Sequence, residues 1–155
     1  MARSAAIPVR KAVPGDLGAL VALERATFES DRISRAQWRR HLASNSACVL
    51  VAGPTGRVDG AAVVFQRRNS TRARLYSLAV AEAARGSGLA KALLAATEAE
   101  ARRRGCDVLE LEVRTDNRAA IGLYERQGYL RAAHLQGFYE DGSDAWRYNK
   151  VLAGP

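Results

Sequence analysis

The chain has 155 residues, with 24 Lys or Arg against 16 Asp or Glu, and a formal net charge of +8. This length fits one domain whose core needs no metal or disulfide, and no run of about eighteen apolar residues predicts a membrane span. The N-terminus has no signal-like apolar segment, so we expect a cytoplasmic protein without a membrane partner. The charge favours anionic partners, although arginines spread over solvated faces would give the same composition. No basic run is interleaved with aromatic residues, so nucleic acid is not an expected partner.

The cysteines and histidines predict no metal site. Cys48 and Cys106 lie far apart, show no metal-ligand spacing, and each begins an apolar segment typical of a strand. Small core side chains are the expected role for both. His41 and His134 are isolated in the sequence. We therefore expect no metal cofactor.

The first half of the chain predicts a strand, two helices and an antiparallel meander. Residues 7–13 alternate enough for a strand, Asp16 can cap a helix that follows it, and a second helix starts after Ser34. Apolar segments joined by short turns then predict neighbouring antiparallel strands. These segments span residues 47–52, 60–67 and 73–80.

The second half predicts a crossover followed by a closing hairpin. A long helix runs from Leu89 to about residue 104 and leads into a strand over residues 106–114, which should be parallel to the strand before the helix. Asp116 or Asn117 can cap the next helix, which stops at Gly128. Strands over residues 129–136 and 144–152 close the chain. We predict a single domain over residues 1–155, of α/β (α+β) class, with a mixed and mostly antiparallel sheet of about seven strands and about four helices.

A glycine-bearing turn joins the strand 73–80 to the long helix. Gly86 and Gly88 let the backbone approach a ligand without a Cβ in the way. The first amides of the helix have no intrahelical partner, and the helix dipole adds positive charge there, so the turn is suited to an anion. The same glycines would also serve a plain strand-to-helix connection, and their spacing alone leaves both interpretations open.

The motif Arg85-x-x-Gly88-x-Ala90 follows Leu78-Ala79-Val80 and precedes Leu93-Leu94. It resembles the pyrophosphate-binding motif of the GNAT superfamily of acyl-CoA N-acyltransferases. The resemblance implies the GNAT fold and acetyl-CoA as co-substrate, with the loop amides holding its pyrophosphate. The residues concerned are Arg85, Gly86, Ser87, Gly88, Leu89, Ala90 and Lys91. The backbone of Leu78, Ala79 and Val80 would bond the pantetheine and acetyl groups.

Acyl transfer to an amine needs a base, an oxyanion donor and an acid for the leaving thiolate. Glu110 and Glu112 share one face of the strand 106–114. Like charges this close, if partly buried, would favour the protonated form of one carboxyl and so suit a base. Arg114 on the same face opposes this effect, and strand carboxylates paired with arginines are the alternative interpretation.

Leu111-Glu112-Val113-Arg114-x-x-Asn117 and Leu123-Tyr124-Glu125-x-x-Gly128-Tyr129 follow in order. These segments resemble the ribosomal-protein alanine N-acetyltransferase (RimI) group of the same superfamily. The resemblance implies that Glu112 is the general base, Tyr124 the general acid and Asn117 a contact to the CoA tail. A tyrosine packed on the sheet and an asparagine that only caps its helix are the alternatives. The resemblance covers residues 76–148 and is looser before them.

These features together predict an acetyl-CoA-dependent N-acetyltransferase that works by direct attack of an amine on the thioester. The favoured acceptor is a protein N-terminal α-amine, with a ribosomal protein as a candidate partner, and Tyr139 is a candidate contact to the peptide N-terminus. One alternative is an enzyme that acetylates a small-molecule amine. The other is a non-catalytic domain that senses acyl-CoA or associates with RNA. The presence of both Glu112 and Tyr124 favours an enzyme.

Overall fold

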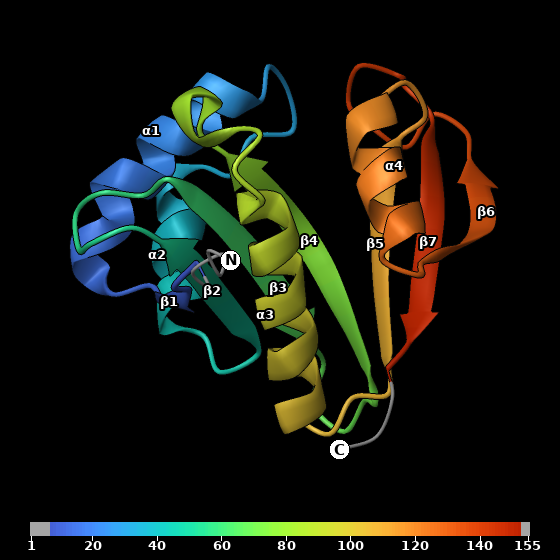
Figure 1. Ribbon diagram of the computed structural model, residues 1–155, viewed down its shortest axis with the longest axis horizontal. Helices are drawn as coiled ribbons and strands as arrows, with labels where there is room; N and C mark the ends of the chain where they lie inside the picture. Colours follow the sequence, from blue (N-terminus) through green and yellow to red (C-terminus); the bar gives the residue numbers. More distant parts are fainter. Residues whose placement is uncertain (1–6, 153–155) are drawn as a thin grey trace, which may run out of the picture.

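The computed structural model describes residues 7–152, which form a seven-stranded sheet with helices on both faces (Figure 1). The predicted domain limits at residues 1 and 155 lie outside this range. The strand order is β1-β2-β3-β4-β5-β7-β6. The strands are β1 (Arg10–Lys11), β2 (Ala47–Ala52), β3 (Gly60–Gln66), β4 (Arg72–Val80), β5 (Val108–Arg114), β6 (Leu130–Leu135) and β7 (Ala145–Val151). The helices are α1 (Leu17–Thr27), α2 (Arg35–Ala43), α3 (Leu89–Arg103) and α4 (Arg118–Arg126), with short 3-10 segments η1 (Pro14–Asp16) and η2 (Glu82–Ala84).

The direction of the strands confirms the predicted meander and crossover. Strands β2, β3 and β4 pair antiparallel in sequence order, whereas β4 and β5, which α3 connects, are parallel. Strand β7 inserts between β5 and β6 and is antiparallel to both. The predicted α/β class with a mixed, mostly antiparallel sheet is therefore confirmed. None of the helices in the described part of the chain has the length and hydropathy that a membrane crossing requires.

The first strand is shorter than predicted, and Asp16 has another role than the expected helix cap. Only Arg10–Lys11 pairs with β2, because the chain turns at Val13 into η1. The buried Asp16 carboxylate accepts the backbone N–H of Val13 at 2.8 Å, the N–H of Gly56 at 3.0 Å, and two bonds from the Arg10 guanidinium. Those bonds, with Arg10 first, hold the pKa of Asp16 well below its usual range. Asp16 thus caps η1 and ties β1 to the β2–β3 turn, and its side chain makes no cap bond to α1.

A separate hydrophobic cluster covers each face of the sheet. One packs the sheet against α3 and α4 and contains Leu75, Leu93 and Leu111; the other packs it against α1 and α2. A bulge in β4 changes which residues face each side. Ser77 lies opposite Val63 and Leu75 opposite Val64, which leaves Tyr76 as the extra residue.

Strands β4 and β5 pair only over part of their length. The last paired residues are Leu75 and Leu111, yet β4 continues to Val80 and β5 to Arg114. The two strands diverge from that point, as Figure 1 shows toward its upper edge. We call this region, residues 76–80 and 112–114, the fork. It is the place where the two faces of the sheet are not separated by strand-to-strand hydrogen bonds.

Gly60 sets how closely α3 approaches the sheet. A Cβ at this position of β3 would lie 2.9 Å from Leu93 Cδ1, 3.0 Å from Leu89 Cδ2 and 3.2 Å from the carbonyl oxygen of Ala79. We therefore expect Gly60→Ala to lower the free energy of unfolding by about 1–3 kcal/mol, as overpacking does. The measurement is urea denaturation. Gly18→Ala is the matched control, since no atom lies within 4 Å of a Cβ there and alanine suits a helix. A Gly60→Ala variant as stable as the wild type would contradict this account.

Candidate active site

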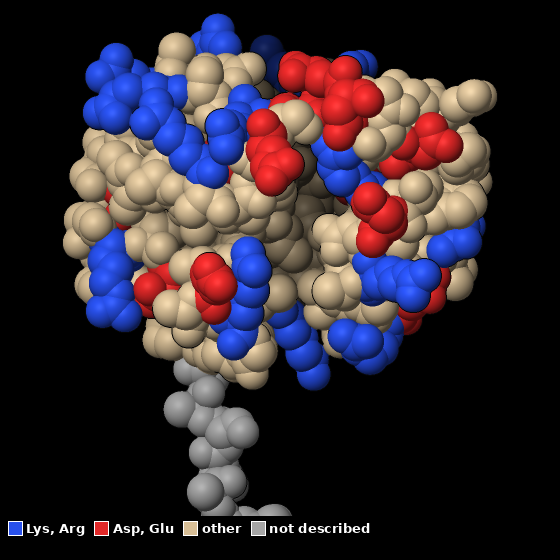
Figure 2. Space-filling view, turned by 90° about the horizontal axis from the view of Figure 1, so that it is seen from above, with Lys and Arg blue, Asp and Glu red and all other residues tan. Residues whose placement is uncertain are grey.

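The molecule is hollowed at the end where β4 and β5 diverge. Figure 2 looks down on this end and shows a depression between the two halves, with acidic and basic side chains around its rim. On the face of the sheet that α3 and α4 cover, the start of α3 lies beside β4 and α4 lies beside β5 (Figure 1).

The turn before α3 combines two glycines of positive φ with backbone amides that have no intrahelical partner. Gly86 and Gly88 adopt φ of +78° and +84°, which favours glycine, and no atom lies within 4 Å of a Cβ built on either. The first intrahelical bond runs from Ala92 N to Gly88 O, so the amides of residues 89–91 precede the hydrogen-bond ladder of the helix. Leu89 is buried in the core, so its amide rather than its side chain is available to a ligand. This turn fits a phosphate group of acetyl-CoA.

The other residues expected at the donor lie at the end of β4, in the turn before α3 and at the start of α4. Leu78, Ala79 and Val80 form the end of β4 beyond its last pair with β5, so their backbone borders the opening. Arg85 is exposed and lines, with α1, a cavity of about 400 Å³ next to the turn. The Oδ1 of Asn117 accepts the N–H of Ala120 at 3.2 Å. Asn117 therefore caps α4, as one of the two interpretations of this residue expected.

Glu112 is the first residue of β5 beyond the last β4–β5 pair, and two arginines hold its carboxylate. Arg74 Nη2 donates to Oε1, and Arg147 Nε donates to Oε2 at 2.9 Å. The side chain is 5 % exposed. A carboxylate offers about four acceptor positions, so these contacts leave capacity for a further proton or hydrogen bond.

Glu110, on the same face of β5 as Glu112, also lies next to arginines. Glu110 Oε1 lies 3.4 Å from Arg147 Nε, and its Oε2 lies 3.9 Å from Arg72 Nη2. Each carboxylate on this face is thus matched by guanidinium groups, which offset their mutual repulsion. The pairing with arginines that the alternative interpretation expected is therefore present, and Glu112 differs from Glu110 in lying beyond the last β4–β5 pair.

Tyr124 and Tyr139 approach the fork from α4 and from the β6–β7 loop. The Tyr124 ring is buried against Tyr129, with ring centroids 5.9 Å apart. Burial raises the pKa of Tyr124, with a smaller contribution from Tyr139. Burial also raises the pKa of Tyr139 to about 12, and among the groups that influence it are Arg114, Glu112 and Asp31. The hydroxyl groups of both tyrosines are therefore protonated at neutral pH.

Arg114 joins the α1–α2 loop to the β6–β7 loop. Its Nη2 donates to Ser30 Oγ at 2.8 Å, and its Nη1 donates to Asp141 Oδ2 at 2.9 Å. The Asp31 carboxylate accepts the N–H of Glu140 at 3.3 Å. The Arg114 guanidinium also lies 4.2 Å from the centroid of the Tyr139 ring. These contacts fix Tyr139 over the α1 side of the fork.

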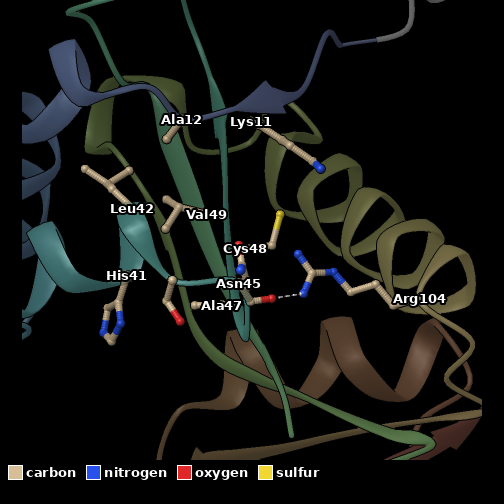
Figure 3. A pocket seen from close by; sticks show the side chains of 10 residues that line it. Lys11, Ala12, His41, Leu42, Asn45, Ala47, Cys48, Val49 and Arg104 are labelled. Carbon is tan, nitrogen blue, oxygen red and sulfur yellow. Dashed lines mark hydrogen bonds between the residues drawn. The ribbon is translucent and has the colours of Figure 1, made fainter. Parts of the chain in front are cut away.

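A second cavity lies away from the fork, between α2, β1, β2 and the end of α3. Figure 3 shows Lys11, Cys48 and Arg104 pointing toward it, and its volume is about 240 Å³. Arg104 donates to Glu100 at 2.8 Å and to Asn45 O at 3.0 Å, and Lys11 Nζ lies 3.7 Å from Glu100. The basic groups here are thus already matched by protein acceptors. Cys48 and Cys106 are both buried, as expected for core residues.

Comparison with known proteins agrees with this geometry. The family described as Acetyltransferase (GNAT) family matches residues 17–129. The chain belongs to this family. N-alpha-acetyltransferase 30 of Schizosaccharomyces pombe is 36% identical over 102 residues, which cover 64% of this chain and 68% of that protein. The predicted GNAT fold and the predicted acetyl-CoA-dependent N-acetyltransferase are confirmed at this level.

Solved GNAT structures resemble nearly the whole described fold. The ribosomal-protein-S18-alanine N-acetyltransferase from Escherichia coli superposes with a TM-score of 0.82 and 25% identity, covering 96% of this chain and 95% of that one. A ribosomal-protein-alanine N-acetyltransferase from Brucella melitensis superposes with a TM-score of 0.79 and 29% identity, covering 94% of this chain and 99% of that one. The predicted similarity to this group of GNAT proteins is therefore confirmed.

The sequence did not show which side chains contact Glu112 and Arg114. Arg74 and Arg147 hold Glu112, although they lie 38 and 35 residues away from it in the chain. Ser30 and Asp31 contact Arg114 from the α1–α2 loop. The alternation of Arg72 and Arg74 with apolar residues was the available signal, since it places both on the face opposite α3. Their partners follow only from the strand order.

Proposed function

We propose that this GNAT protein transfers the acetyl group of acetyl-CoA to the α-amino group of a protein N-terminus. The observation that carries the proposal is the position of Glu112 at the base of the fork, with its side chain on the face opposite α3 and α4. The donor turn lies on one face and the carboxylate on the other, so an amine that enters from the α1 side would meet a donor bound on the α3 side. Names of relatives support the acceptor class: N-alpha-acetyltransferase and ribosomal-protein-alanine N-acetyltransferase.

The residues of the fork would divide the chemistry as follows. When bound, acetyl-CoA supplies the thioester carbonyl. The turn of residues 85–91 would hold its pyrophosphate, the backbone of residues 78–80 would orient its acetyl end, and Asn117 would contact its tail. Glu112 would accept a proton from the incoming ammonium, so that the nitrogen can form the new N–C bond. Tyr124, whose phenol is protonated at neutral pH, would give its proton to the sulfur as the C–S bond breaks, and the second proton that the nitrogen loses would pass to solvent and restore the phenol.

The acceptor would lie along the loops that Arg114 connects. Tyr139 is half-buried at this place and is held by its contact with Arg114. Its ring and hydroxyl would contact the first residue of the peptide. The acceptor would pass between the two loops, with Ser30 and Asp31 on one loop and Asp141 on the other. A ribosomal protein is the acceptor that the structural relatives favour.

The test measures CoA release from acetyl-CoA with a panel of short peptides. Each peptide is used with a free N-terminus and, as matched control, with a blocked one, and polyamines and free amino acids are measured in parallel. We expect release with free N-termini and none with the blocked peptides. Release with small amines alone would contradict the acceptor and leave the donor in place. Binding of acetyl-CoA without release in any mixture would support the acyl-CoA-sensing alternative.

A further inference from the structure

Arg74 reaches across the base of the fork. It lies opposite Glu110 in the parallel β4–β5 register, yet its Nη2 donates to Glu112, two residues further along β5. Its own neighbour Leu75 forms the last pair with β5. Arg74 therefore bridges the two strands at the point where they stop sharing backbone hydrogen bonds.

The carboxylate of Glu112 is held from two sides. Arg147 lies directly opposite it in the β5–β7 register and donates to Oε2, while Arg74 donates to Oε1 from β4. A donor from one strand alone would leave the carboxylate free to rotate about its Cγ–Cδ bond. Two donors on different strands fix the direction of both oxygens.

Arg74 keeps this position at a cost in stability. Its Nε is buried and has no hydrogen-bond partner among residues 7–152. A buried donor without a partner costs free energy, and such costs in folded proteins concentrate at functional sites. The guanidinium is thus oriented toward Glu112, although this orientation leaves its own Nε without a hydrogen-bond partner among the described residues.

We infer that Arg74 is a positioning residue for acetyl transfer, which aims the Glu112 carboxylate at the place where the acceptor ammonium arrives. The inference rests on the proposed function in taking Glu112 as the base. Other charged or titratable groups also face Glu112. They are Glu110 and Arg114 on β5, Arg147 on β7 and Tyr139 on the β6–β7 loop.

The test compares Arg74→Gln, Arg74→Lys and the control Arg72→Gln. Arg72 lies two residues earlier on β4, is also a cation, and pairs with Glu110 instead of Glu112. We expect Arg74→Gln to lower kcat about 10-fold with the KM values for acetyl-CoA and peptide unchanged. Arg74→Lys should restore part of kcat, and Arg72→Gln should resemble the wild type.

A second measurement separates this inference from the proposed function. Carbon-13 relaxation of the labelled Glu112 carboxylate reports how firmly it is held, without turnover. Greater mobility of the carboxylate in Arg74→Gln than in the wild type supports the role of Arg74 even if no peptide is acetylated. Carboxylate mobility equal to that of the wild type would overturn it. A rise in the peptide KM alone would also overturn it, since Arg74 would then bind the acceptor.

Discussion

Replacing Glu112 by glutamine should lower kcat for peptide acetylation by roughly 10³-fold, because the amide cannot accept the proton of the ammonium. The KM for acetyl-CoA should stay the same, since the turn of residues 85–91 lies on the other face of the sheet. Steady-state kinetics over a range of pH is the measurement. Turnover equal to that of the wild type at every pH would show that Glu112 is not the base.

The matched control for this substitution is Glu110→Gln. Glu110 lies on the same face of β5 and contacts Arg72 and Arg147, but it is paired with β4 and precedes the fork. We expect its kcat to remain within about threefold of the wild type. Glu112→Gln should also lower the free energy of unfolding by about 1–2 kcal/mol, because Arg74 and Arg147 lose a charged partner. The two effects are separable because activity is measured well below the unfolding transition.

Replacing Tyr124 by phenylalanine should lower kcat by roughly 10²-fold, because the ring remains while the proton for the leaving sulfur is lost. Stability at neutral pH should change little, since the ring that packs against Tyr129 is retained. The control is Tyr129→Phe, which removes the bond of 2.8 Å from the Tyr129 hydroxyl to Glu98. That variant should be less stable with kcat nearly unchanged. A Tyr124→Phe variant with full kcat would contradict the acid role.

The raised pKa of Tyr124 also gives an expectation for alkaline pH. Because the folded pKa lies above the unfolded value of about 10, the phenol contributes stability that is fully present below pH 10 and is lost as pH rises through the folded pKa. Phenylalanine has no proton to lose. The decline in the midpoint of thermal unfolding above pH 10 should therefore be smaller in Tyr124→Phe than in the wild type.

The order of the elements could be predicted from the sequence because it depends on local signals. The cap at Ser34 accepts the N–H of Gln37, and Asn117 caps α4, as their residue types indicate. The parallel pairing of β4 and β5 followed from the helix between them. The role of Asp16 could not be predicted, since it depends on Arg10 and on Gly56, which lies 40 residues further along the chain.

In the candidate site, too, the local motifs could be predicted, whereas the contacts between residues far apart in the chain could not. The motif around Gly88 and the segment around Glu112 were visible in the sequence, and the structure brings both to the fork. The environment of Glu112 was not visible, because the insertion of β7 between β5 and β6 decides that Arg147 lies opposite it. The contact of Arg74 with Glu112 was not visible either, because it depends on the register of β4 against β5.

Transfer to an α-amine is tested most directly with a peptide that carries both a free N-terminus and an internal lysine. The purified protein is incubated with acetyl-CoA and this peptide, and fragmentation mass spectrometry locates the acetyl group. We expect acetylation of the α-nitrogen in the wild type and its loss in Glu112→Gln. Acetylation of the lysine alone, or none while acetyl-CoA binds, would contradict the proposal that this fork serves a protein N-terminus.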